Sequence, residues 1–212
     1  MHFSMKNKDY IYSSLSSNDN IKGIIHICHG KGEHIGRYSW LTSMLNSDGY
    51  HVISMDHRGH GRWDKKNHEK GIFAKINGWE VITEDLRNLI VDTNQKYPNL
   101  DQYLLAHSMG SWVGLNLIMN NTNIKGLIIS GSSKFPRSLI LVQKFLINIS
   151  IFFKGEHAIN PILNYVTDTT WNNKFKPNKT SFDWISSDPD NVKDYVNDDL
   201  CGFSITNSMW KD

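Results

Sequence analysis

The stretch 103–114, "YLLAHSMGSWVG", decides the fold of this chain. An apolar run ends at a histidine and Ser108, small residues follow, and a second apolar run begins. This pattern predicts a buried strand over 102–107 and a largely buried helix over 109–121, with a sharp turn between them. A serine on such a turn is exposed at the carboxyl end of a sheet, where it can act as a nucleophile. The alternative is that Ser108 only caps the helix that begins at Met109.

Small residues surround Ser108, as a sharp turn of this kind requires. Ala106, Ser108 and Gly110 fit the pattern G-x-S-x-G, with alanine in place of the first glycine. The five-residue pattern is weakly specific by itself. Its position after an apolar strand and before a buried helix makes Ser108 the candidate nucleophile.

Strand-like and helical segments alternate on both sides of this turn. Apolar runs rich in β-branched residues predict strands, and apolar residues three or four apart predict helices. The expected strands are 9–16, 22–30, 50–56, 102–107 and 124–132, and the expected helices are 35–49, 79–97 and 109–121. This alternation implies right-handed crossovers and a mostly parallel sheet with helices on both faces. The chain is therefore predicted to be an α/β protein.

The pattern changes after the last expected strand. Helical or irregular segments with turn residues extend over 133–205, without a clear strand–helix unit. This region is predicted to be an insertion lying over the sheet, a cap or lid. Residues 1–132 then form the core, and residues 206–212 begin the return to it.

The most apolar part of the expected cap is the stretch 138–153. Lys144 and Asn148 interrupt it, and it is too short for a comfortable membrane span. It either packs as a partly buried helix or touches a lipid surface.

Composition and charge exclude several other classes of protein. Lys and Arg total 23 and Asp and Glu total 21, so the net charge is near +2. This balance does not indicate a nucleic-acid binder. Cys28 and Cys201 lie in no C-x-x-C pattern, so neither a disulfide framework nor a zinc site is expected. The N-terminus has no apolar h-region of a signal peptide, and we expect a reducing, cytoplasmic setting, with peripheral membrane contact at most.

Two backbone N–H groups are candidates for an oxyanion hole beside Ser108. The N–H of Met109 lies at a helix N-terminus, where unpaired donors and the helix dipole favour negative charge. A second donor is expected from a loop after an earlier strand. The loop "HGKGEH", 29–34, is placed for this role, with the N–H of Lys31 as the donor. The alternative for this loop is a plain glycine-rich turn.

Three ordered motifs resemble the monoacylglycerol lipase and lysophospholipase branch of the α/β-hydrolase family. They are "HGKGEHIGRY" (29–38), "DHRGHGRW" (56–63) and "AHSMGS" (106–111), and "SDPDNVKDYVNDDLC" (187–201) resembles the end of that family's cap. The resemblance spans essentially the whole chain. It implies that Ser108 is the nucleophile, that Lys31 and Met109 supply the oxyanion N–H groups, and that the cap covers an acyl-chain pocket. The helix near 139–153 would then meet a membrane or a fatty substrate.

Serine chemistry needs a histidine base and an orienting acid, and in this fold both follow the nucleophile in the chain. The resemblance places them on two further strands beyond the cap, on the order of 60 more residues at ordinary element lengths. The only histidine after Ser108 is His157, inside the expected cap. The sequence therefore predicts an incomplete hydrolase that lacks the last two strands, either a fragment or a truncated product. A complementing C-terminal segment would fill the exposed sheet edge.

Three functional hypotheses remain open at this point. The first is a serine hydrolase of carboxylic esters, acting on monoacylglycerol- or lysophospholipid-like substrates through an acyl-enzyme on Ser108, without metal or other cofactor. The second is a catalytically incompetent fragment or degenerate domain that binds acyl ligands. The third keeps the enzyme but changes the bond to a thioester or peptide, because fold does not fix substrate.

Overall fold

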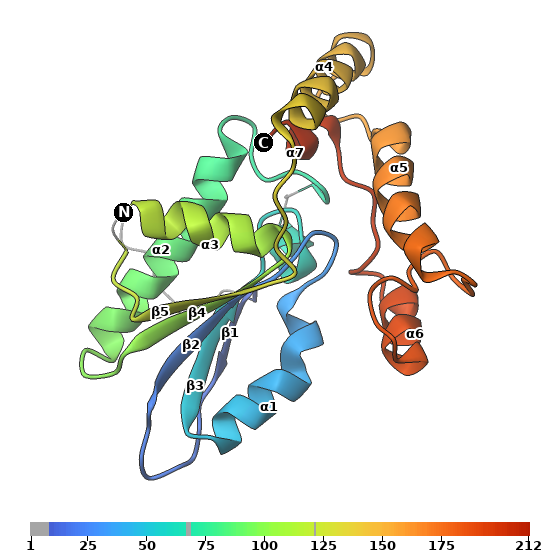
Figure 1. Ribbon diagram of the computed structural model, residues 1–212. Coiled ribbons are helices and arrows are strands. Elements are labelled where there is room, and N and C mark those ends of the chain that lie inside the picture. The colour runs from blue at the N-terminus through green and yellow to red at the C-terminus, as the bar shows by residue number, and fades with distance from the viewer. Residues whose placement is uncertain (1–8, 67–68, 121) are drawn as a thin grey trace. The chain divides into compact units, whose positions relative to one another are not determined.

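The structure is a computed structural model that describes residues 9–66, 69–120 and 122–212. It consists of two compact units, one up to Lys134 and the other Phe135–Asp212 (Figure 1). Each unit is described by itself.

The first unit is built on a five-stranded sheet of order β1-β3-β2-β4-β5. The strands are β1 (Ile11–Ser14), β2 (Gly23–Cys28), β3 (Tyr50–Met55), β4 (Gln102–His107) and β5 (Gly126–Ser130). All neighbouring pairs are parallel except β1 and β3, which are antiparallel. The predicted mostly parallel α/β sheet is confirmed. Because β2 and β4 pair directly, the segments that follow these two strands emerge side by side at one end of the sheet.

Helices cover both faces of this sheet (Figure 1). They are η1 (Ile35–Tyr38), α1 (Ser39–Ser47), η2 (Gly61–Lys66), α2 (Gly78–Lys96) and α3 (Met109–Met119). Successive residues of a strand point to opposite faces. Accordingly, Ile24 packs with Leu89 of α2, whereas Ile25 packs against Leu41 and Leu45 of α1. The core therefore lies in two layers, one on each side of the sheet.

The helix expected over 35–49 is divided into a short 3₁₀ segment and α1. The His34 side chain accepts a hydrogen bond from the N–H of Gly36 and so caps η1. At the other end, Gly49 has a φ of +91° and stops the helix where the sequence predicts.

The second unit is helical, as predicted for this region. Its elements are α4 (Arg137–Lys154), α5 (Pro161–Asn172), η3 (Asn173–Phe175), α6 (Pro189–Asn197) and α7 (Asn207–Lys211). Asn207, at the start of α7, ties this helix to the end of α4: its backbone N–H donates to Ala158 and its side-chain amide to the carbonyl of Gly155. Of the eighteen residues of α4, only Ile147 is buried. No helix in the described part of the chain combines the length and apolarity needed to cross a bilayer.

Candidate active site

Ser108 lies on the turn between β4 and α3 in a conformation that serine rarely adopts. Its φ is 53° and its ψ is −121°, and its side chain makes no capping hydrogen bond to α3. Such backbone strain costs on the order of 1–3 kcal/mol and is concentrated at functional sites. The flanking peptides hold the turn: the N–H of Ser108 donates to Ser130 on β5 at 2.9 Å, and the N–H of Ser111 donates to the Ser108 carbonyl at 2.9 Å.

Two glycines let the backbone of β2 approach this turn closely. A Cβ on Gly110 would lie 2.2 Å from the carbonyl oxygen of Cys28, so the first turn of α3 rests on the end of β2. A Cβ on Gly30 would lie 3.0 Å from the Cβ of Ser108. The loop after β2 therefore lies against the serine.

The two predicted oxyanion donors belong to the segments that meet here. Met109 is the first residue of α3 and directly follows Ser108. Lys31 directly follows Gly30, the residue that contacts Ser108. The first N–H groups of a helix have no partner within it, so the N–H of Met109 is available to a ligand by its position. Their role in holding an oxyanion stays a prediction.

Glu33 orders the loop 29–34 and was not singled out by the sequence. Its Oε1 accepts from the N–H of Gly30 at 2.6 Å and from the hydroxyl of Tyr38 at 2.8 Å, and its carboxylate pairs with Arg37 at 3.7 Å. Burial, followed by the Glu33 charge, raises the pKa of Tyr38 well above its usual range, so this phenol stays a donor. A lone carboxylate in a glycine-rich loop was the signal that could have identified Glu33.

Asp56 joins three separate segments around the loop 56–63. Its carboxylate accepts from the hydroxyl of Tyr12 on β1, from the N–H of Ile35 and from the N–H of Arg62. Burial raises the pKa of Asp56 despite these bonds. The side chain is fully buried, so its role in the described structure is to hold the loops.

Three histidines next to this carboxylate are buried, and burial is the largest cause of their lowered pKa values. The pKa falls well below its usual value for His29, to about 4 for His57 and to about 3 for His60. The His29 and His57 rings stand 4.3 Å apart, and each neighbouring histidine disfavours a further charge. All three are therefore neutral near pH 7.

Three further histidines of the first unit also have local partners. His26 contacts the carbonyl of Ile53 and the side chain of Gln102, and burial lowers its pKa. His51 accepts from the N–H of Ser16, and His107 contacts the Ser130 hydroxyl at 3.4 Å. These contacts explain the positions of the three side chains, and no role as a catalytic base is needed to explain them.

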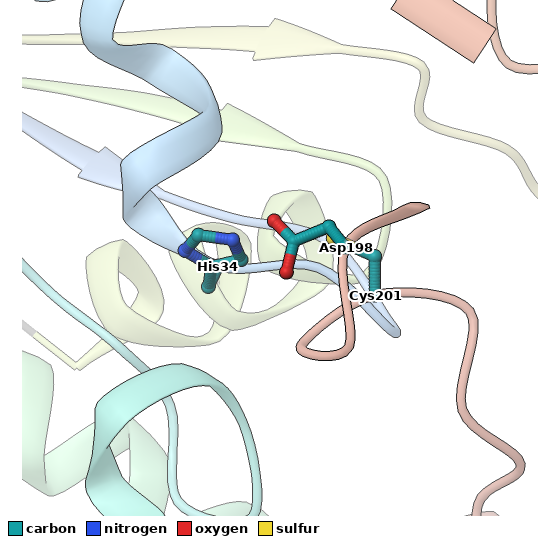
Figure 2. Close-up of side chains that lie close together, drawn as sticks. All are labelled: His34, Asp198 and Cys201. Carbon is teal, nitrogen blue, oxygen red and sulfur yellow. The ribbon is translucent and has the colours of Figure 1, made fainter. Parts of the chain in front are cut away.

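Figure 2 shows three side chains with metal-binding atom types, those of His34, Asp198 and Cys201. His34 caps η1 in the first unit. In the second unit, Asp198 closes the turn after α6, because its side chain accepts from the N–H of Leu200 and its carbonyl from the N–H of Cys201. We assign no metal to these residues. Cys28 and Cys201 are both free thiols, and burial raises the pKa of Cys28.

The second unit contains an open groove of about 1050 Å³. Its lining includes Tyr165 and Asn172 of α5, Phe182, Gly202 and Ser204. Its lining mixes amides and hydroxyls with the rings of Tyr165 and Phe182.

A mostly parallel sheet with both faces covered, carrying a strained serine on the turn from strand to helix, defines an α/β-hydrolase. Residues 19–212 match the model of the serine aminopeptidase S33 family. The match covers most of the chain, and the chain belongs to this family.

Several relatives are lipases or phospholipases by name. The chain is 36% identical to a monoglyceride lipase homolog of Monkeypox virus over 103 residues, which is 49% of this chain and 35% of the viral protein. It is 31% identical to phospholipase YtpA of Bacillus subtilis over 150 residues, which is 67% of this chain and 54% of that protein. The matched part thus spans about a third of one relative and about half of the other.

Solved structures agree on the fold. A carboxyl esterase from Bacillus coagulans superposes with a TM-score of 0.84 at 24% identity, covering 100% of this chain and 70% of the esterase. A monoglyceride lipase from Saccharomyces cerevisiae superposes with a TM-score of 0.71 at 18% identity, covering 95% of this chain and 62% of that one.

Proposed function

We propose that this chain carries the nucleophile of a serine hydrolase that cleaves carboxylic esters through an acyl-enzyme on Ser108. The observation that carries the proposal is the positive φ of Ser108 on a turn between β4 and α3, with the loop after β2 packed against it. Strain of this kind is retained where the surrounding structure holds a group for function. The same turn places a helix N-terminus beside the serine, where developing negative charge is favoured.

In the proposed reaction, the Ser108 oxygen attacks the acyl carbon of the ester. The backbone N–H groups of Lys31 and Met109 stabilise the oxyanion of the tetrahedral intermediate. Collapse of the intermediate expels the alcohol, which takes up the proton lost by the serine, and leaves the acyl group on Ser108. Water then attacks the acyl carbon, and the acid leaves as the serine regains its proton.

A histidine base and its acid come from polypeptide outside this sequence in our proposal. The described histidines of the first unit are buried or engaged in structural contacts, and His157 belongs to the second unit. The covered 70% of the Bacillus coagulans esterase leaves room for such a segment in a protein of this fold.

The strand β5 is the proposed place where that segment pairs. It is the last strand in the sheet order, and its side chains Ile128 and Ile129 are 55% and 40% exposed. Successive residues point to opposite faces, so both faces of this edge expose apolar side chains. Parallel sheets are normally covered on both faces, which is what a further strand with its helix would do.

We propose monoacylglycerol- or lysophospholipid-like esters as the substrates. The names of the relatives support this class, as does the apolar surface of α4, where Phe152 and Phe153 are 82% and 76% exposed. The second unit would act as a cap that binds the acyl chain, and α4 would contact a lipid surface transiently.

A fluorophosphonate probe tests the nucleophile directly, because it phosphonylates an activated serine. We expect slow labelling of the chain by itself, since a broken triad leaves roughly 10³- to 10⁴-fold catalysis over water. Labelling is expected to disappear in Ser108→Ala and to persist in Ser43→Ala, which changes an exposed serine of α1. Labelling that persists in Ser108→Ala would refute the proposal that Ser108 is the nucleophile.

A catalytically incompetent domain that binds acyl ligands is the second candidate, favoured by the buried, neutral state of the core histidines. A panel of monoacylglycerol, lysophospholipid, thioester and peptide substrates separates the two. Binding of a monoacylglycerol without turnover or labelling, in a chain extended by the matching segment of the esterase fold, would favour the binding domain.

A further inference from the structure

The His29 side chain links the loop 29–34, which borders Ser108, to the loop 56–63. It is fully buried at the end of β2. Its Nδ1 lies 2.8 Å from the carbonyl oxygen of Gly30, and its Nε2 lies 2.9 Å from the backbone nitrogen of His57. One ring nitrogen therefore faces the loop 29–34, and the other faces the loop 56–63.

These two contacts fix the tautomer of the ring. The backbone nitrogen of His57 is a donor, so Nε2 of His29 must be the unprotonated acceptor. The proton then sits on Nδ1, which donates to the carbonyl of Gly30. The other nearby acceptor, the Asp56 carboxylate, is 4.0 Å from Nε2 and accepts from the N–H of Ile35 instead. The ring is neutral, because burial and the neighbouring histidines lower its pKa well below the usual value.

The bond to Gly30 sets the direction of the next N–H group. In a trans peptide, the carbonyl oxygen and the following N–H point in opposite directions. The Gly30 carbonyl points at the His29 ring, so the N–H of Lys31 points away from that ring. The other peptide of Gly30 is fixed as well, because its N–H donates to Glu33 at 2.6 Å.

From these contacts we infer that His29 is a positioning residue of the oxyanion hole. Its Nδ1–H holds the Gly30–Lys31 peptide in the orientation that presents the Lys31 N–H to the acyl oxygen. The inference rests on the proposed function of Ser108 and assigns His29 no direct contact with substrate. It also explains why a polar side chain is kept in a fully buried position next to the nucleophile.

A pair of substitutions separates this role from simple support of the loop 56–63. In His29→Asn, the side-chain amide nitrogen takes the place of Nδ1, so the bond to Gly30 is kept and the bond to His57 is lost. In His29→Gln, the side-chain oxygen takes the place of Nε2, so the bond to His57 is kept and the bond to Gly30 is lost.

The measurement is the rate of fluorophosphonate labelling of Ser108, with thermal unfolding recorded on the same samples. We expect His29→Asn to stay within about threefold of the parent and His29→Gln to fall roughly 10- to 100-fold, because loss of one oxyanion donor costs about 10²–10³. The opposite ranking, or equal losses in both variants, would overturn the inference.

A measurement that does not depend on activity tests the inference even if the variants fail to fold or the parent chain is not labelled. Nitrogen-15 NMR of the histidine rings of the parent chain reports which nitrogen carries the proton. The inference requires the Nδ1–H tautomer for His29, and an Nε2–H tautomer would refute it even if Ser108 reacts. Conversely, absence of labelling in a chain extended by the segment that supplies the base, with the Nδ1–H tautomer present, would reject the proposed function and leave the loop geometry standing.

Discussion

Ser108 stores backbone strain that its own side chain does nothing to relieve. A φ of 53° with a ψ of −121° is a region that glycine adopts easily and other residues do not. The strain persists because hydrogen bonds to Ser130 and Ser111 hold both sides of the turn. The surrounding hydrogen bonds therefore hold the Ser108 backbone in a conformation that a serine would not adopt by itself.

This strain predicts an unusual order of stability among substitutions at one position. Ser108→Gly is expected to be more stable than Ser108→Ala by about 1 kcal/mol, because relief of strain outweighs the entropy that glycine gains in the unfolded chain. Urea denaturation measures the difference. The matched pair Ser43→Gly and Ser43→Ala in α1 should give the opposite order, since glycine costs roughly 1 kcal/mol within a helix. Equal stabilities at position 108 would show that the turn is not strained.

At the level of elements, α4 presents an unusual amount of apolar surface. The sequence left open whether this helix is partly buried or touches lipid, and the structure buries only Ile147. Its C-terminal turn ends in two exposed phenylalanines.

We expect α4 to bind to vesicles through this turn. The double change Phe152→Ser and Phe153→Ser should weaken binding to phosphatidylcholine–phosphatidylglycerol vesicles by at least tenfold, because each buried phenylalanine contributes about 1.5–3 kcal/mol. Sedimentation of vesicles with the protein measures the effect. Ile162→Ser changes a residue of α5 that is 69% exposed, and it should leave binding nearly unchanged. Equal losses of vesicle binding in the double variant and in Ile162→Ser would mean that α4 has no special role in binding.

The exposed edge of β5 predicts self-association of the chain. An apolar strand at a sheet edge is a template for pairing with another chain. The isolated chain should therefore self-associate, and Ile129→Lys should shift it toward the monomer by placing a charge on that edge. Light scattering at increasing concentration measures this shift. Ile76→Lys makes the same change at a loop residue that is 75% exposed, and a similar shift there would rule out a special role for β5.

For the molecule as a whole, the buried histidines couple stability to pH. Folded His57 has a pKa of about 4, against 6.5 for an unperturbed histidine. Between these values the unfolded chain binds a proton that the folded chain does not, so the stabilisation is complete above pH 6.5 and is lost as the pH falls toward 4. The loss is about 3 kcal/mol for this group, at 1.36 kcal/mol for each pKa unit.

Urea denaturation at a series of pH values tests this dependence. His60 and His29 should make the free energy of unfolding depend more steeply on pH, because their pKa values are also lowered. The raised pKa of Asp56 acts in the opposite direction and offsets part of the loss near its own titration. In His57→Gln, the free energy of unfolding should fall less steeply between pH 6.5 and 4. An unchanged slope would show that His57 does not contribute to the pH dependence.

Much of this architecture was predictable because it depends on local patterns. The strand–serine–helix sequence placed β4, Ser108 and α3, and alternating apolar runs placed the remaining strands within a few residues. What was missed depends on contacts between distant segments. The bonds that Asp56 accepts from Tyr12 and from the N–H of Ile35 exist only after strands have paired, so no local pattern reveals them. Glu33 is the exception, because the bond that it accepts from the N–H of Gly30 is local.

The turn at Ser108 is held by three neighbouring strands of one compact unit, because β2 and β4 pair directly and the Ser108 N–H donates to Ser130 on β5. The hydrogen-bonded register of β2 and β4 fixes the Ser108 turn relative to the loop 29–34, and no residue after Lys134 contributes to that register. If the proposed function holds, exchange of the helical region for an unrelated one would change the substrates while leaving Ser108 and its neighbouring amides in place. Selectivity and chemistry could then be varied independently in this scaffold.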